Sequence, residues 1–142
     1  MSGKIFHHTH RVTYAECTIG NHIYYARYLD LLEAARGEFF RELGFPFSKL
    51  QEETIFPVVE SHLHYKAPAR YDDLLGIEIW LTKLHGVRMN FASRVLNQNN
   101  RLLLEGETLH VCMGLNEKPK RPPEPLAERL RPYLREPTGN VA

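Results

Sequence analysis

The sequence predicts an α+β fold in which one long helix packs against a curved antiparallel sheet. Residues 28–43 carry apolar side chains at helical spacing, whereas most of the remaining chain alternates apolar and polar side chains with the period of a strand. Tight turns join the long strand patterns, which favours an antiparallel meander. Because an amphipathic helix must bury its apolar face, we expect a wide sheet to curl around it.

The composition is that of a globular protein built as one domain. The chain has 142 residues, of which 43% are hydrophobic, and a formal net charge of +1. We expect residues 1–142 to form a single domain, with a core over about 4–115 and a proline-rich tail over 117–142. The balanced charge argues against nucleic acid or anionic lipid as the main partner.

The cysteines and the apolar segments indicate the compartment. Cys17 and Cys112 form no CxxC pair, which argues against a disulfide framework or a zinc ribbon and fits a reducing cytosol. No stretch approaches the roughly 18 apolar residues of a membrane span. We therefore expect a soluble, cytoplasmic protein with no membrane span and no cofactor or metal.

The first third of the chain predicts a strand, a turn and the central helix. Residues 6–14 alternate as a strand does, and residues 16–22 hold turn and capping residues, among them Asn21 as a candidate N-cap. The helix stripe then runs over 28–43. Gly44 suits the position after a helix, and Pro46 prevents continuation.

The rest of the chain is dominated by strands. A short helix is predicted over 48–53, followed by alternating segments at 58–66, 75–82, 87–96 and 102–113. A short helix is also predicted after Pro125 and is expected to end at Pro132.

One strand face carries a candidate metal-binding pattern. Glu60, His62, His64 and Lys66 lie on the same face of their strand, and a His-x-His pair can ligate a metal. The sequence offers no convincing further ligands. A polar face turned to solvent or to a second subunit is therefore the favoured interpretation.

Four ordered motifs carry a family resemblance over about residues 12–122. They are V-x-Y-x-E at 12–16 followed by HIYYARYL at 22–29, LEAARGEF at 32–39, YKAPARYDDLLGIEI at 65–79, and the closing TLHVCMGLNEKPKRPP. Together they resemble the hot-dog fold of the hydroxybenzoyl-CoA thioesterase family, and most closely its YbgC-type acyl-CoA thioesterase branch. The resemblance implies a hot-dog fold with one long central helix wrapped by a curved antiparallel sheet.

The resemblance also implies a thioesterase, but the usual catalytic acid is replaced. In the family an aspartate stands ten residues before the tyrosine that matches Tyr28, and this chain has Thr18 there. Threonine holds no negative charge near neutral pH, so it is a poor general base without an activating partner.

Three interpretations of Thr18 stay open. In the first, Glu16 supplies the carboxylate, although capping the turn is its expected role. In the second, water aligned by neutral groups attacks a carbonyl polarised by an oxyanion site. In the third, the protein binds acyl thioesters without hydrolysing them. The second resembles the enediyne-polyketide thioesterases, which lack the acid and rely on an arginine matching Arg36.

The resemblance assigns further roles. The position of Tyr25 offers its backbone N–H to the thioester oxygen, since a helix start has free N–H groups and positive partial charge. His22 orients water or the carbonyl, or bonds to backbone, and Arg36 fixes the loop or touches substrate. Basic residues available for the phosphates of the substrate are Arg70, Arg88, Arg94, Lys118, Lys120 and Arg121.

The sequence hypothesis is therefore an acyl-thioester hydrolase acting on acyl-CoA or acyl-carrier-protein substrates. The candidate catalytic residues are Thr18, Tyr25, Arg36, Glu16 and His22. The alternatives are a non-catalytic acyl-thioester binding protein and, as a minor option, a hot-dog dehydratase. By the same resemblance we expect a homodimer or homotetramer with sites between subunits.

Overall fold

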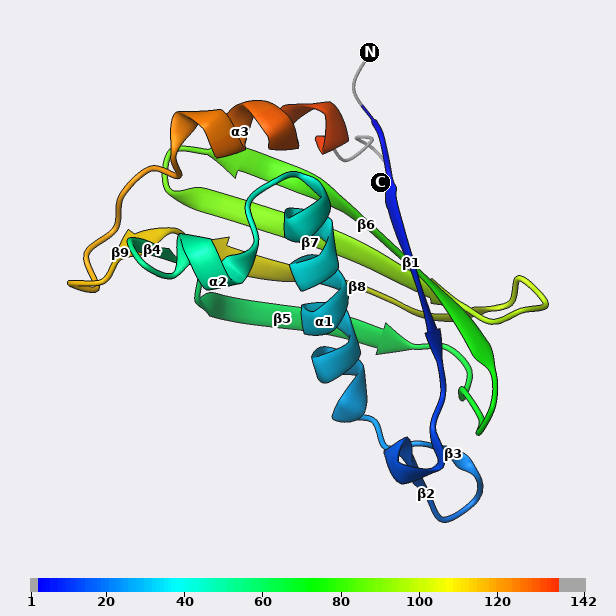
Figure 1. Cartoon of the computed structure of the whole chain (residues 1–142). Helices are drawn as coiled ribbons and strands as arrows, with labels where there is room; N and C mark the ends of the chain where they lie inside the picture. Colours follow the sequence, from blue (N-terminus) through cyan, green and yellow to red (C-terminus); the bar gives the residue numbers. More distant parts are fainter. Residues whose placement is uncertain (1–2, 136–142) are drawn as a thin grey trace.

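A five-stranded antiparallel sheet forms the body of the protein, in a computed structural model that describes residues 3–135. The order is β1-β6-β7-β8-β5, as Figure 1 shows. The strands are β1 (Phe6–Arg11), β5 (Val58–Tyr65), β6 (Leu74–His85), β7 (Arg88–Leu96) and β8 (Leu102–Val111). The predicted meander is confirmed as β6, β7 and β8, which follow one another through tight turns.

The central helix α1 (Arg27–Glu42) lies across one face of this sheet (Figure 1). Its buried residues recur every three or four positions, as the sequence predicts, and are Tyr28, Leu31, Leu32, Ala35, Arg36, Phe39 and Phe40. Opposite them lie fully buried residues of the strands, such as Ile77, Leu81 and Phe91. One apolar core therefore joins helix and sheet, and the predicted hot-dog arrangement is confirmed.

The proline-rich segment adds to this core beyond residue 115. Helix α3 (Glu124–Leu130) begins with Pro125 in its first turn, and the 3-10 helix η2 (Arg131–Tyr133) contains Pro132. Leu126 and Leu130 are fully buried, and the Tyr133 ring meets Phe39 at 4.7 Å between centroids. Pro132 thus ends the α-helix as predicted.

Helix α3 also completes the end of α1. Arg129 donates a hydrogen bond of 2.8 Å from Nη1 to the carbonyl oxygen of Leu43, which follows the last residue of α1. A cation at this end satisfies a free carbonyl and opposes the negative end of the helix dipole. Gly44 has φ +91°, the left-handed conformation predicted for the position after the helix.

Shorter elements fill the connections. They are the 3-10 helix η1 (Tyr14–Glu16), β2 (Cys17–Thr18), β3 (His22–Ile23), α2 (Phe47–Leu50), β4 (Thr54–Ile55) and β9 (Met113–Gly114). β2 pairs with β3, and β4 pairs with β9. The prediction of Asn21 as N-cap is wrong, because the N-cap of α1 is Ala26, and Asn21 occupies a turn with φ +58°.

β1 and β5 are the two edges of the sheet. Seven of the eight residues of β5 are exposed, including Val58, Val59 and Tyr65. β5 contacts β8 closely, because Gly106 lies against the backbone of β5 and a Cβ there would come 2.4 Å from the carbonyl oxygen of His62. No helix in the part described is long and apolar enough to cross a membrane.

Candidate active site

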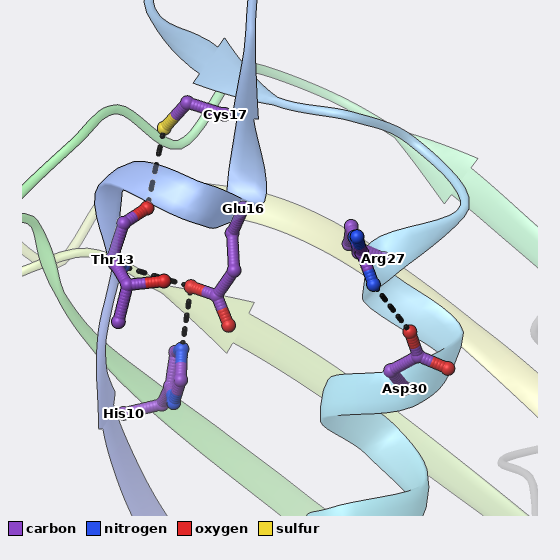
Figure 2. Close-up of polar contacts among 6 residues, drawn as sticks. All are labelled: His10, Thr13, Glu16, Cys17, Arg27 and Asp30. Carbon is purple, nitrogen blue, oxygen red and sulfur yellow. Dashed lines mark hydrogen bonds and ion pairs between the residues drawn. The ribbon is translucent and has the colours of Figure 1, made fainter.

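The turn before the central helix is held together by the Glu16 carboxylate. Its Oε1 accepts hydrogen bonds of 2.9 Å from the backbone N–H of Thr13 and 2.9 Å from Nε2 of His10 (Figure 2). Burial alone raises the pKa of Glu16, but the bonds from His10 and Thr13 outweigh it and hold the pKa below its usual value. Glu16 is therefore an ionised residue that fixes the turn, as expected from the sequence.

A short hairpin with a three-residue loop places Thr18 and His22 opposite each other. Thr18 in β2 is paired with His22 in β3, and the intervening Gly20 and Asn21 both have positive φ. The Oδ1 of Asn21 accepts a 3.2 Å hydrogen bond from the N–H of Tyr71, which fastens the hairpin to the chain before β6. Thr18 is exposed at the surface.

The chain from Ile23 to α1 leaves two backbone donors free. The N–H of Ile23 bonds to the carbonyl of Ala69, and that of Tyr24 bonds to the carbonyl of Glu16. Within residues 3–135, no protein acceptor takes a hydrogen bond from the N–H of Tyr25 or from that of Ala26, which lie just before α1, and of these two residues only Tyr25 lines the hollow described below. A free N–H at a helix start carries positive partial charge and is suited to bind an oxygen atom.

These residues surround a hollow of about 370 Å³ beside the start of α1. The residues that line it come from β2, β3, the start of α1 and the end of β5, and are Thr18, His22, Ile23, Tyr24, Tyr25, Tyr28, Tyr65, Lys66, Ala67 and Pro68. Three of the five predicted site residues, Thr18, His22 and Tyr25, therefore share one hollow. Glu16 and Arg36 do not line it.

The hollow has an aromatic wall with protonated hydroxyls. The Tyr65 ring lies 6.2 Å from that of Tyr25 and 5.7 Å from that of Tyr28 between centroids. The Tyr28 hydroxyl oxygen accepts a 3.3 Å hydrogen bond from the N–H of Ala69. Burial raises the pKa of both Tyr28 and Tyr65, so neither is ionised near neutral pH.

Cys17 adds no reactive thiolate beside the hollow. Burial, followed by the negative charges of Glu16 and Asp73, raises the pKa of its thiol, and Sγ lies 3.7 Å from the carbonyl oxygen of Thr13 (Figure 2). A thiol with a raised pKa is a weak nucleophile at neutral pH. The chemistry available in the hollow is therefore a backbone donor, neutral hydroxyls, an imidazole and the Lys66 ammonium.

The predicted basic residues are dispersed over the molecule. Arg70 donates from Nη1 to the carbonyl oxygens of Gly20 and Asn21 at 3.3 Å each, beside the hollow. Arg94 lies over the Trp80 ring, and Lys120 bonds to the carbonyl of Glu53. Of these three, only Arg70 lies close enough to the hollow to meet a ligand there.

The motif His62-x-His64 forms no metal centre in the described part of the chain. His62 donates from Nε2 to Glu60 at 2.9 Å, and both side chains are exposed. No group of three ligating side chains converges within residues 3–135. The His62–Glu60 contact is thus a surface pair.

Comparison with known proteins places this architecture in a family. The family model described as the thioesterase-like superfamily matches residues 12–130. The chain belongs to the thioesterase-like superfamily. Acyl-CoA thioester hydrolase YbgC of Escherichia coli is 34% identical over 133 residues, which span 92% of this chain and 99% of that protein.

Two solved structures agree with this chain in fold. A hypothetical protein from Thermus thermophilus is 32% identical, with a TM-score of 0.81 over 87% of this chain and 95% of that one. A probable thioesterase from Bartonella henselae is 26% identical, with a TM-score of 0.80 over 84% and 100%. These two proteins thus share the fold over more than four fifths of this chain.

Sequence reasoning on this thioesterase-like chain missed several residues of the site region. Lys66 was assigned to a polar strand face, yet it lines the hollow. Thr108 and His110 were treated only as part of a closing motif, but both are buried beneath α1. Their spacing of two, which places both polar groups on the same face of their strand, is the signal that could have revealed them.

Proposed function

We propose that the protein is an acyl-thioester hydrolase, with acyl-CoA or an acyl-carrier-protein thioester as substrate. The free N–H of Tyr25, in a hollow shared with Thr18 and His22, is the observation that carries this proposal. The acyl-CoA hydrolase name of a relative that matches almost the whole chain supports it. Lys66 and Arg70 supply positive charge beside the hollow for the substrate phosphates.

In the proposed reaction the Tyr25 N–H donates to the thioester carbonyl oxygen. A water molecule held by the Thr18 hydroxyl and His22 attacks the carbonyl carbon, and the oxygen takes up negative charge. Collapse of this intermediate breaks the C–S bond, and the electron pair leaves with sulfur. One water proton ends on the thiol, and the other is lost as the product acid ionises.

The backbone donor accounts for a useful rate without an aspartate. A donor aimed at the developing oxyanion contributes about 3 kcal/mol, or roughly 100-fold or more in rate. Thioesters are activated acyl donors, so water needs less activation by a base. In this scheme Glu16 is a positioning residue, because its carboxylate is occupied by Thr13 and His10.

The decisive measurement is thiol release from a panel of acyl-CoA and acyl-carrier-protein thioesters. We expect Tyr25→Pro, which deletes the donor, to lower kcat by about 100-fold. Ala26→Pro deletes the next N–H, which is also free but belongs to a residue that does not line the hollow, at a φ of −69° that already suits proline; it should retain the rate. Circular dichroism of both variants is the check that they fold. Equal rates for Tyr25→Pro and wild type would refute the oxyanion role.

Absence of turnover above buffer across the whole panel would remove the hydrolase proposal. The second candidate, a non-catalytic acyl-thioester binding protein, is favoured by one observation: no Asp or Glu lines the Thr18 hollow among the described residues. Thr18→Asp separates the two. Hydrolysis created by this change in an inactive parent would establish a competent scaffold with binding as its natural function.

We also propose that two chains pair through β5. The exposed Val58, Val59 and Tyr65 on an edge strand support this arrangement, since the unpaired backbone of an edge favours addition of another strand. Tyr65 and Lys66 would then bring the hollow to the subunit boundary. The same substrate panel tests whether acyl-carrier-protein thioesters are hydrolysed. Sedimentation tests the pairing through β5 and a tetramer built from such pairs.

A further inference from the structure

A second, larger cavity adjoins the Thr18 hollow along α1. It encloses about 580 Å³ between α1, α2, β5 and the sheet. Successive residues of α1 separate the two spaces, since Tyr28 lines the hollow and Leu29 lines the cavity. Its apolar wall includes Phe40, Phe47 and Phe91. A thioester held at the start of α1 therefore has an apolar space beside it for its acyl group.

Arg36 is a buried cation in this cavity. The residue is 8% exposed, and its Nη1 atom has no hydrogen-bond partner among residues 3–135. No carboxylate of the described residues lies within ion-pair distance of it. Burial lowers the pKa of Arg36, an effect that the charge of Glu33 partly opposes. A buried charge without a partner destabilises a protein unless something else compensates it.

The neighbouring polar groups of the cavity are neutral. Nδ1 of His110 lies 2.9 Å from the carbonyl oxygen of Phe56, which can only accept, so this nitrogen carries the proton. Nε2 therefore accepts the hydroxyl proton of Thr108 at 2.9 Å. Burial, assisted by the charge of Arg36, lowers the pKa of His110 to about 4. The imidazole thus stays neutral and does not share the positive charge.

The carboxylates of the cavity do not neutralise Arg36 either. Asp30 and Glu33 line the cavity but are exposed. Asp30 is engaged by Arg27 at 3.5 Å, as Figure 2 shows. The interior of the cavity therefore holds one positive charge, that of Arg36, and the Nη1 donor of Arg36 has no acceptor among the described residues.

We propose that this cavity receives the acyl group of the substrate and that Arg36 binds an oxygen acceptor, a carboxylate or a keto group, on that acyl chain. The inference rests on the proposed function, which puts the thioester at the start of α1. Arg36 lies nine residues after Arg27, about 14 Å along the helix axis, so the acceptor belongs well away from the thioester. The substrate class is thus an acyl thioester oxygenated in its distal part.

The test compares alkyl, oxo-substituted and carboxyl-terminated acyl-CoA thioesters at several chain lengths. We expect kcat/KM for the best oxygenated substrate to exceed that of the matched alkyl substrate by about 10- to 100-fold, because hydrogen bonds to charged groups contribute this much. The carboxyl and oxo series distinguish an anionic from a neutral acceptor. Alkyl substrates used as well as both oxygenated series would overturn the proposal.

The variant Arg36→Met separates selection of the acyl group from catalysis. It should reduce the ratio of kcat/KM between the oxygenated and the matched alkyl substrate from about 10- to 100-fold to about one. An equal loss for every substrate would place Arg36 in the reaction itself and contradict the proposal. Arg41→Met, at an exposed arginine of the same helix paired with Glu38, is the matched control.

Thermal unfolding gives a readout that needs no activity. Removing an unpaired buried charge should raise the Tm of the unliganded Arg36→Met protein, whereas Arg41→Met should change it little. A fall in Tm on Arg36→Met would show that Arg36 is already paired, for example with a carboxylate of a second subunit, and would overturn the proposal.

Binding of non-hydrolysable thioether analogues distinguishes this inference from the proposed function. If no thioester is hydrolysed but the carboxyl or oxo analogue binds more tightly than the alkyl analogue in calorimetry, the inference stands and the hydrolase proposal fails. If hydrolysis occurs and all analogues bind alike, the hydrolase proposal stands and this inference fails.

Discussion

Two buried or half-buried side chains are held in their deprotonated forms, one of them charged and the other neutral. Glu16 is held ionised by donors from His10 and Thr13, whereas His110 is held neutral between Thr108 and the backbone of Phe56. Both have folded-state pKa values below their ordinary values, and for both the stabilising contribution is lost as the pH falls. The two losses occur in different pH ranges.

Glu16→Gln should destabilise the protein at neutral pH by about 1–2 kcal/mol, the contribution of hydrogen bonds to a charged acceptor. Because the folded pKa of Glu16 lies below 4.5, its stabilisation is complete above that pH and disappears as the pH falls through the folded pKa. Denaturant unfolding of wild type and variant at several pH values measures this. A difference between them that persists at the acid limit would contradict the role assigned to the charge.

Titration of His110 sets the pH dependence of stability in the pH range above that of Glu16. Its pKa falls from 6.5 in the unfolded chain to about 4 in the fold, so between these values the unfolded state binds more protons. Stability should therefore rise with pH from about 4 to 6.5, by about 3 kcal/mol. His110→Asn, which retains a donor near the Nδ1 position, should flatten this rise in the same unfolding series. A slope unchanged in the variant would assign the titration to another group.

At the scale of elements, the pairing of β5 with β8 depends on one glycine. A Cβ at Gly106 would lie 2.4 Å from the backbone carbonyl oxygen of His62 in β5 and 2.6 Å from the Leu63 side chain. A side chain can change its rotamer to relieve such a clash, but the backbone of a paired strand cannot. A residue of any other type there must push the edge strand outward. Because β5 contributes to both the hollow and the cavity, such a shift would disturb both.

Gly106→Ala should lower the free energy of unfolding by about 1–3 kcal/mol, the usual cost of overpacking. Gly76→Ala is the matched control, since Gly76 lies in β6 and has no atom within 4 Å of the added Cβ. Alanine at that position should be neutral or slightly stabilising. Thermal and denaturant unfolding of the two variants gives the comparison, and equal destabilisation would contradict the steric argument.

The positions of helices and strands could be predicted from local sequence patterns, whereas the details of the site could not. The stripe from Tyr28 to Leu43 predicts a helix that the structure places at 27–42. The prediction succeeds because apolar residues at helical spacing lie on one face of a helix, and that face is buried. The hairpin at Thr18 depends instead on partners far along the chain, such as Arg70 and Tyr71. Contacts over some 50 residues leave no local periodicity, so the failed N-cap prediction for Asn21 has a physical cause.

At the scale of the whole molecule, the two edges of the sheet differ in character. β1 exposes polar side chains such as Thr9 and Arg11, while β5 exposes Val58 and Val59, the latter 50% exposed. Exposed β-branched apolar residues on an edge favour pairing with another strand. This asymmetry supports assembly through β5 rather than through β1.

Val59→Lys should shift the protein from dimer to monomer in sedimentation velocity, because a charge on an edge strand opposes strand addition. Thr9→Lys on the opposite edge is the matched control and should leave the sedimentation coefficient unchanged. A wild-type protein that sediments as a monomer at all concentrations would remove the pairing proposal, and with it any contribution of a second chain to the hollow.

The bond from Arg129 to Leu43 joins residues 86 positions apart, and Tyr133 reaches Phe39 over a similar span. During synthesis the central helix therefore leaves the ribosome long before the residues that finish its far end have been translated. Until then the Leu43 carbonyl lacks this donor, and the Phe39 ring lacks one of its aromatic neighbours. Chains that stall before residues 124–133 are made should accordingly be substrates for chaperones and proteases.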